Sequence, residues 1–271
     1  MSTKINKLYI SSDIEGTNGI NNWDETEYGT NRYYQFQNQM NKEVKAVTSG
    51  AIEKGIKDIL VKDAHDSGRN LLHTELPKEV KLHRSWDGSP LSMMASIDES
   101  YDAVAFTGYH SPSKSDGNTL AHTMNTRIAH VKLNGEIVSE FLLNTYTASY
   151  YNVPILFLSG DEELTKIVNK LNPNIKTYAT KVGTHGSTIS KHPDIVTEEL
   201  NQAIKQAIDS FDKEKNFVPL PPKFIVEVEY KLPIDAYRNS FYPGCKLINP
   251  TTISFTTKDY YEVLRMCKFT L

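Results

Sequence analysis

Short apolar segments alternate with longer segments of helical periodicity over the first two thirds of this 271-residue chain. Residues 8–10, 59–61 and 103–106 are continuous apolar runs, which are typical of strands buried on both faces of a sheet. Residues 32–54 and 161–171 instead space their apolar side chains as amphipathic helices do. This alternation predicts an α/β fold, with a mostly parallel sheet and helices on both faces in three layers.

The pattern changes after about residue 182. Residues 193–211 predict one long helix, and residues 224–230 alternate apolar and polar side chains, as a half-exposed antiparallel strand does. Before the change, residues 127–138 indicate a hairpin that turns at an Asn-Gly pair. We therefore expect an α/β domain over residues 1–182 and a smaller C-terminal α+β lobe over residues 183–271.

The composition argues against a nucleic-acid or membrane partner. The chain has 30 basic residues (lysine and arginine) and 33 acidic ones, a formal net charge of -3, and no long run of like charge. It lacks a stretch of about eighteen apolar residues, and its polar first seven residues do not resemble a signal peptide. Its two cysteines, Cys245 and Cys267, are too few for a disulfide framework. We therefore expect a cytoplasmic protein.

Metal-competent side chains follow three of the expected strands. They are Asp13 and Glu15 after the first strand, Asp63 and His65 after the second, and His110 after the strand that begins at residue 103. The carboxyl ends of parallel strands meet at one edge of a sheet, where ligands bind. Imidazoles and carboxylates together suit a first-row divalent ion such as zinc, manganese or iron, and they suit calcium poorly. The number of candidate ligands also permits two ions bridged by one carboxylate.

Five short motifs occur in order along the chain and together carry a family resemblance. They are Ser12-Asp13-Ile14-Glu15-Gly16, Asp63-Ala64-His65, Gly108-Tyr109-His110, Ala121-His122-Thr123-Met124 and Glu140-Phe141-Leu142-Leu143-Asn144. In this order the chain resembles the bacterial zinc D-aminopeptidases associated with dipeptide-transport operons. The resemblance extends over nearly the whole sequence.

The resemblance implies a binuclear centre with two Zn²⁺ ions per subunit, which other divalent ions could replace. By the same match, Asp13 is the bridging ligand, Glu15 and His65 bind one ion, and His110 and Glu140 bind the other. His122 matches a histidine that is not a ligand, lies beside the metals and acts in catalysis. It would carry a proton to the leaving amine or stabilise the oxyanion. His185, in a glycine-flanked loop, is the next candidate for that role.

The resemblance also implies an activity and an assembly. The activity is hydrolysis of the N-terminal residue, a D-amino acid, from short peptides by a water activated between two zinc ions. The assembly is a large ring-like homo-oligomer, such as a decamer, whose active sites face an internal chamber. The C-terminal lobe would contribute to its contacts.

The sequence departs from the family pattern around Glu140. Ser139, Leu142 and Ser149 stand where the family usually has glycines. The ligand set is unchanged, so the expected difference is in the size of the pocket, because Leu142 lies within one helical turn of Glu140.

Two alternative functions remain open at this stage. A two-metal phosphoesterase uses the same ligand types, and Lys62 and Arg69 are the nearby basic residues that could bind phosphate oxygens. A non-catalytic protein could instead hold a metal and capture peptides. Metal-dependent release of an amino acid from a D-alanyl peptide would distinguish the aminopeptidase hypothesis from both alternatives.

Overall fold

Residues 4–271, which the computed structural model describes, form two sheets. The strands of the larger sheet are β1 (Lys7–Ser12), β2 (Asp58–Asp63), β3 (Val80–His83), β4 (Ala103–Tyr109), β7 (Ile155–Asp161), β8 (Lys176–Thr184) and β9 (Ser187–Ser190). Their spatial order is β3-β2-β1-β4-β7-β8-β9, and each neighbouring pair is parallel except β8 and β9. The mostly parallel sheet expected from the sequence is therefore confirmed.

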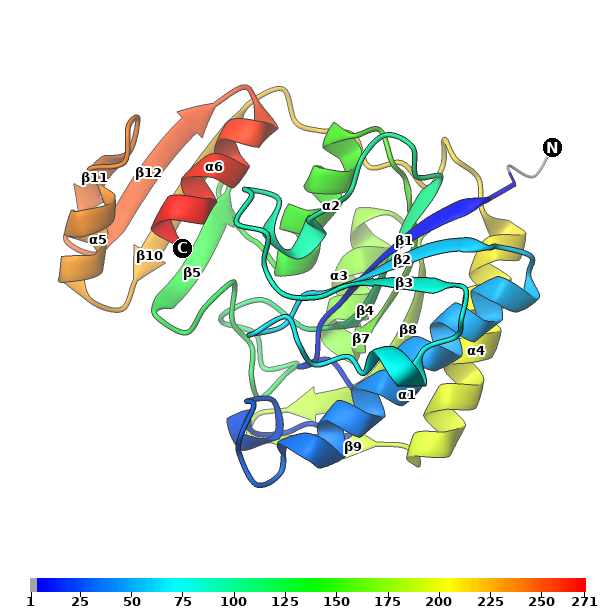
Figure 1. Cartoon of the computed structure of the whole chain (residues 1–271). Coiled ribbons are helices and arrows are strands. Elements are labelled where there is room, and N and C mark those ends of the chain that lie inside the picture. Colours follow the sequence, from blue (N-terminus) through cyan, green and yellow to red (C-terminus); the bar gives the residue numbers. More distant parts are fainter. Residues whose placement is uncertain (1–3) are drawn as a thin grey trace.

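Helices cover both faces of this sheet (Figure 1). They are α1 (Tyr33–Glu53) and α4 (Pro193–Ser210) on one face, and α2 (Glu140–Tyr150) and α3 (Glu162–Leu171) on the other. Successive side chains of β1 point to opposite faces of the sheet, and both faces carry apolar side chains that helices must cover. Leu8 and Ile10 pack in the core beneath α1 and α4, whereas Tyr9 packs in the core on the other face. The expected three-layer α/β arrangement is confirmed.

The smaller sheet is antiparallel. It consists of β5 (Ile128–Leu133), β6 (Glu136–Ile137), β10 (Phe224–Tyr230), β11 (Lys246–Asn249) and β12 (Thr252–Thr257), in the order β11-β12-β10-β5-β6. Two helices accompany it, α5 (Pro233–Asn239) and α6 (Tyr260–Thr270). Figure 1 shows the green strand β5 beside the orange strand β10, although about ninety residues separate them in sequence.

The two sheets do not divide the chain at residue 182. The hairpin of β5 and β6 comes before that position and joins the smaller sheet, whereas β9 and α4 come after it and join the larger one. The physical reason is pairing, because Leu133 and Val131 lie opposite Val226 and Val228 in β10 and share one buried core with them. A composition change along the chain does not report such a long-range pairing.

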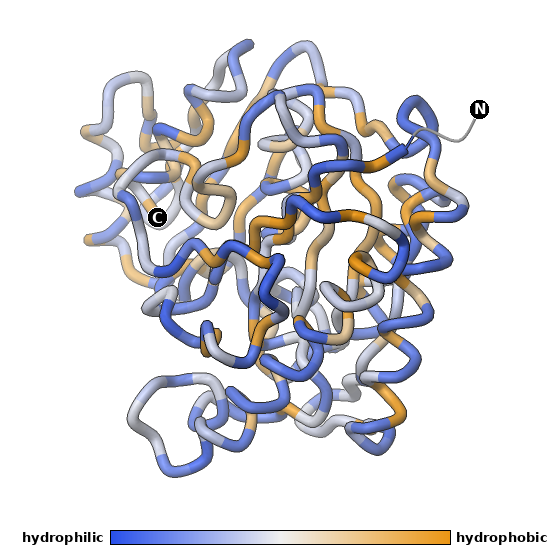
Figure 2. Tube along the Cα trace, turned by 45° about the vertical axis from the view of Figure 1, so that its right-hand side comes forward, coloured by the Kyte–Doolittle hydropathy of each residue, from blue (hydrophilic) through white to orange (hydrophobic). Residues whose placement is uncertain are grey.

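The apolar stretches of the chain gather along the strands inside the molecule, and hydrophilic stretches lie at its periphery (Figure 2). Within residues 4–271, no helix combines the length and the apolar character that crossing a membrane requires.

Candidate metal centre

The carboxyl ends of β1, β2 and β4 lie side by side, because β1 pairs in parallel with both of the others. Ser12 at the end of β1 lies opposite Asp63 in β2 and Thr107 in β4. The pairing continues past the strand ends, since the Asp13 amide donates to the Thr107 carbonyl at 2.8 Å. The loops that follow these strands therefore leave the sheet together.

Two glycines let the loops after β1 and β4 touch. The Gly16 amide donates to the Gly108 carbonyl at 2.8 Å. A Cβ at Gly16 would lie 1.8 Å from the Tyr109 carbonyl oxygen, and one at Gly108 would lie 2.2 Å from the Asp13 carbonyl oxygen. Gly108 also has a φ of +66°, which side chains disfavour. Any larger residue at either position would push the two loops apart.

The six site residues that the sequence predicts meet at this edge. Their ligand atoms fall into three overlapping groups with separations within 4.8 Å, namely Asp13, Glu15 and His65, then Asp13, His110 and Glu140, then Glu15, His110 and His122. Strand ends, the loops that follow them and one helix bring these residues together.

Asp13 belongs to two of these groups and directs one carboxylate oxygen toward each. Nδ1 of His65 lies 3.3 Å from Oδ1 of Asp13 and 3.1 Å from Oε2 of Glu15. On the other side, Nε2 of His110 lies 3.6 Å from Oδ2 of Asp13 and 3.5 Å from Oε2 of Glu140. This placement would allow the Asp13 carboxylate to contact one ion with each oxygen.

Glu140 enters the site from a helix rather than from a strand end. It is the first residue of α2, after the N-cap Ser139, whose side chain accepts from the Leu142 amide. Its Oε1 accepts a hydrogen bond from the Met124 amide at 2.7 Å, which orients the carboxylate. Reasoning from strand ends alone missed Glu140, and only the family resemblance pointed to it.

Each of the three histidines has one ring nitrogen bound to a backbone carbonyl. The pairs are Nε2 of His65 with Thr26 at 3.0 Å, Nδ1 of His110 with Ser111 at 2.9 Å, and Nδ1 of His122 with Leu120 at 2.9 Å. Because a carbonyl oxygen only accepts, the bound nitrogen carries the proton in the neutral ring. The other nitrogen then carries a lone pair on the side of the carboxylates, where an ion bound among them could accept it.

Burial leaves several polar atoms of the site unsatisfied. Oδ2 of Asp13, Oε2 of Glu15 and Nε2 of His110 are buried and have no hydrogen-bond partner among residues 4–271. An unpartnered buried polar atom costs about 1–3 kcal/mol, and more when it is charged. A divalent cation between these atoms would satisfy them, so the residues fit a metal centre.

The pKa values of the site residues also show that several carboxylates are buried close together. Burial, reinforced by the Glu15 carboxylate, raises the pKa of Asp13 well above its usual range. Burial works to raise the pKa of Glu15 as well, but the charge of His65 and its hydrogen bond, together with the charges of His110 and His122, lower that pKa well below its usual range. Burial works to lower the pKa of His110, yet the carboxylates of Glu140, Glu15 and Asp13 together raise it to about 10. Without a metal, protons on His65, His110 and Asp13 would relieve the repulsion among the carboxylates.

A buried lysine supports the loop that carries Glu15. Nζ of Lys181, in β8, donates to the carbonyls of Glu15 and Ile20 at 2.6 Å each. Burial lowers the pKa of Lys181 to about 8. The sequence contains no local signal for this contact, because Lys181 and Glu15 are 166 residues apart along the chain.

His122 lies at the more open side of the site. Its side chain is 13% exposed, against 8% or less for His65 and His110. Its ring stacks on His110 with 4.4 Å between ring centroids, and the edge of Trp23 contacts it. Its Nε2 lies 3.5 Å from Oε1 of Glu140. His122 and the carboxylates of Asp13, Glu15 and Glu140 line a cavity of about 410 Å³.

Other residues that the sequence singled out lie apart from this cavity. Asp63 accepts from the Asn70 and Leu71 amides and shapes the loop after β2. His185 is 85% exposed at its side chain and faces Asp116.

The two basic candidates for phosphate binding are also placed elsewhere. Nζ of Lys62 donates to the carbonyls of Asp63 and Ser85 and lies over the ring of Trp86. Arg69 is exposed and, in the part of the chain that the structure describes, does not line the cavity. Neither of the two basic residues on which the phosphoesterase alternative relied is therefore available to hold phosphate at the metal-binding groups.

The three residues that replace the family's usual glycines contact other parts of the fold rather than the cavity. Ser139 caps α2, and Oγ of Ser149 donates to the Thr145 and Val218 carbonyls. Leu142 packs against the core between the two sheets. Within residues 4–271, none of the three lines the cavity, so the expected change in pocket size is not seen.

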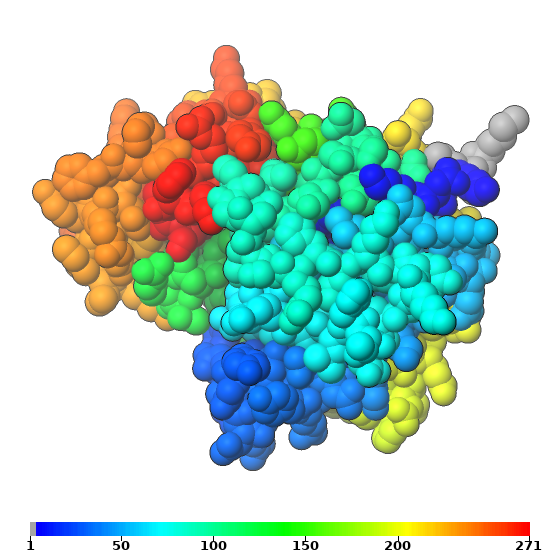
Figure 3. Space-filling model, in the orientation of Figure 1, coloured from blue at the N-terminus to red at the C-terminus, as the bar shows by residue number. Residues whose placement is uncertain are grey.

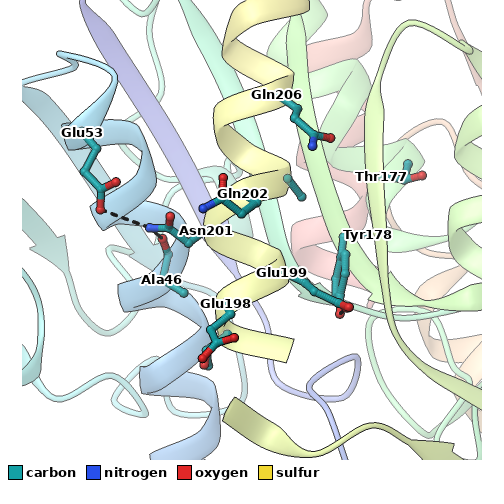
Figure 4. Close-up of a pocket in the computed structure, with 11 residues that line it drawn as sticks. Ala46, Glu53, Thr177, Tyr178, Glu198, Glu199, Asn201, Gln202 and Gln206 are labelled. Atoms are coloured by element: carbon teal, nitrogen blue, oxygen red, sulfur yellow. Dashed lines mark hydrogen bonds between the residues drawn. The ribbon is translucent and has the colours of Figure 1, made fainter. Parts of the chain in front are cut away.

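A wider hollow of about 930 Å³ lies between α1, α4 and β8 (Figure 4). Two of the three glutamates that line it, Glu199 and Glu53, are engaged, since Glu199 accepts from Tyr178 and Lys191, and Glu53 accepts from Asn201. It contains no histidine among the described residues that line it. The chemistry of this chain therefore belongs to the cavity above the strand ends.

Comparisons with known proteins match this geometry. Residues 6–269 match the peptidase family M55, described as D-aminopeptidase. A curated D-aminopeptidase of Bacillus subtilis (strain 168) is 30% identical over 258 residues, which cover 94% of this chain and 93% of the relative. A solved structure of the zinc-dependent D-aminopeptidase DppA from Bacillus subtilis, a self-compartmentalizing protease, is similar with a TM-score of 0.90 and 26% identity, over 97% of each chain.

Proposed function

The chain belongs to the peptidase family M55 of D-aminopeptidases and is a zinc-dependent peptidase, and we propose that its buried centre holds two zinc ions and serves to remove the N-terminal residue of short peptides. The observation that carries this proposal is the position of Asp13, which faces one ligand group with each carboxylate oxygen. Glu15 and His65 would complete the first ion's ligands, and His110 and Glu140 those of the second.

Two zinc ions in this position would lower the pKa of a water and polarise the scissile carbonyl. The residues of the chain prepare the site for that chemistry. The backbone carbonyls bound to the histidines fix the ring orientations, and the Met124 amide fixes Glu140. The buried walls keep other water away from the ligand atoms, which strengthens the interactions among them.

His122 is proposed to move the proton. Because its Nδ1 is bound to the Leu120 carbonyl, its Nε2 is free to accept a proton and to donate it to the leaving amine. Nε2 lies 3.5 Å from Oε1 of Glu140, close to the ligand atoms and in the wall of the cavity. The greater exposure of His122 compared with the proposed ligands supports a role above the ions rather than between them.

The proposed substrate is a short peptide with a D-amino acid at its N-terminus. The name of the family and the names of both relatives support this choice. We also propose a cytoplasmic location, which the two free thiols of Cys245 and Cys267 support.

A metal and substrate analysis tests the function directly. Protein purified without chelator is expected to contain about two zinc ions per chain and to release the first residue from D-alanyl dipeptides. The same peptides with an acetylated N-terminus and their L-alanyl counterparts are the matched controls and should be cleaved far more slowly. Elemental analysis and a chromatographic assay for the free amino acid provide the readouts. Metal-free protein with undiminished activity would contradict the proposal.

The assembly is proposed to be a ring-like homo-oligomer, such as a decamer, with contacts through the smaller lobe. The self-compartmentalizing relative supports this, as do large apolar side chains left exposed on α5 and α6 and after α5, namely Ile234 at 63%, Phe241 at 70% and Phe269 at 68%. Sedimentation equilibrium should give a mass several times that of the 30.7 kDa chain. A mass equal to one chain at micromolar concentration would count against the assembly.

A further inference from the structure

The cavity above the metal centre is lined by acidic residues and one basic residue. Among the described residues that line it, Lys268 is the only lysine or arginine. The carboxylates of Glu27 and Asp66 also line it, in addition to those of the metal centre, and both residues are exposed. Away from the metal-binding groups, Lys268 is therefore the one cationic side chain among the described lining residues, and it favours a negative group of a ligand at its own position.

A smaller, mostly apolar cavity adjoins the first at Lys268. It has a volume of about 180 Å³, and Ser92, Met124 and Lys268 line both cavities. The remaining wall of the small cavity is formed by Pro90, Leu91, Leu143, Asn144, Leu264, Cys267 and Leu271. Figure 3 shows the red helix α6 against the turquoise segment that includes residues 90–92. The path from the metal centre therefore leads past Lys268 into an apolar recess.

The helix that carries Lys268 is held firmly in place. Oη of Tyr260, at the start of α6, donates to the Leu143 carbonyl of α2 at 2.6 Å. At the other end, the Thr270 carbonyl accepts from Tyr230 at 2.9 Å and from Asn239 at 3.0 Å. The backbone at residue 268 is thus positioned before any ligand arrives, which reduces the entropy lost on binding.

The Lys268 ammonium group is not used by the fold. None of the hydrogen bonds and ion pairs between residues 4 and 271 involves its Nζ, whereas Arg265 on the same helix is paired with Glu262 at 2.7 Å. Lys268 is therefore free to bind a ligand, and Arg265 is a matched basic residue that is not.

We propose that Lys268 binds the free carboxylate of the peptide substrate, and that the apolar recess beside it takes the side chain of the residue after the scissile bond. This inference rests on the proposed aminopeptidase function and adds its substrate class, a short peptide with an unblocked C-terminus and an apolar second residue. With its carboxylate at Lys268, the peptide would present its amine toward the metal centre, and Glu27 and Asp66 would disfavour a carboxylate at their own part of the wall.

A pair of substrates that differ only at the C-terminus tests the proposal. The probes are D-alanyl-leucine with a free carboxylate and the same dipeptide as its amide, assayed with the zinc-loaded full chain. The wild type is expected to prefer the free acid by about tenfold or more in kcat/KM, the scale of a hydrogen bond to a charged group. Lys268→Met should remove this preference by raising KM for the acid, with kcat and the amide reaction unchanged. Lys268→Arg should keep it, and Lys268→Glu should reverse it.

Arg265→Met is the matched control, because it removes the same charge from the same helix outside both cavities. It should retain the wild-type preference. Equal hydrolysis of acid and amide by the wild type, or an equal loss for both with Lys268→Met, would overturn the carboxylate subsite while leaving the aminopeptidase function intact. Failure of the zinc-loaded wild type to cleave either dipeptide would overturn the proposed function and this inference with it.

Discussion

Replacement of Asp13 by alanine is expected to remove both metal ions and to lower kcat/KM by at least about a thousandfold. The physical reason is that Asp13 faces both ligand groups, so its loss weakens the binding of both ions at once. Two metal ions supply several kcal/mol of transition-state stabilisation, and each 1.4 kcal/mol or so is a factor of ten in rate. Elemental analysis of the purified variant and a D-alanyl peptide assay measure the two effects.

Two further variants make this result specific. His65→Ala removes a residue from one ligand group only, so it should mainly deplete one ion. Asp66→Asn removes an exposed carboxylate from the cavity wall and should leave the metal content unchanged. If Asp13→Ala retained two ions per chain, Asp13 would not be the bridge and the two-ion centre would have to be assigned differently.

His122→Ala is expected to lower kcat by about a hundredfold or more while the metal content stays at the wild-type value. A positioned acid–base group contributes roughly 10²–10⁴ to the rate, and His122 Nε2 lies beside the ligand atoms with its tautomer fixed by the Leu120 carbonyl. Steady-state kinetics with elemental analysis of the same preparation provide the measurement.

A purely structural role for His122 makes a different prediction. Its ring packs between His110 and Trp23, so a structural residue would cost stability, and activity would scale with the folded fraction. His185→Ala is the control, because that histidine is exposed and distant from the cavity wall, and its loss should leave kcat near the wild-type value. Near-normal kcat in fully loaded, folded His122→Ala protein would show that another group moves the proton.

Much of the larger sheet and its helices could be predicted from local patterns. The helix expected over residues 32–54 is α1, Tyr33–Glu53, and the one expected over residues 193–211 is α4, Pro193–Ser210. These elements are predictable because buried faces impose a period of 3.6 residues on helices and continuous apolar runs on central strands. The partition of the chain between the two sheets was not predictable in this way, because the pairing of β5 with β10 joins distant segments.

Some residues of the site could likewise be located from local sequence patterns, and others could not. Asp13, Glu15, His65 and His110 could be located from sequence, because a residue that follows a parallel strand must lie at the carboxyl edge of the sheet. Glu140 could be reached only through the family resemblance, since it begins a helix after the hairpin of the smaller sheet. Lys268 had no signal in the sequence, because it is one of the chain's many lysines and lies on a short helix far from the metal-binding motifs.

The sequence by itself determined the layered α/β architecture and the kind of chemistry that its strand ends can support, because both follow from the local order of apolar and polar residues. Only the tertiary structure decided which carboxylate faces two ligand groups and which cation borders the cavity. It also showed that Leu142 packs into the core and leaves the cavity open. These features depend on the packing of α2 and α6 against the sheets, and packing joins residues whose separation along the chain carries no information about their distance in space.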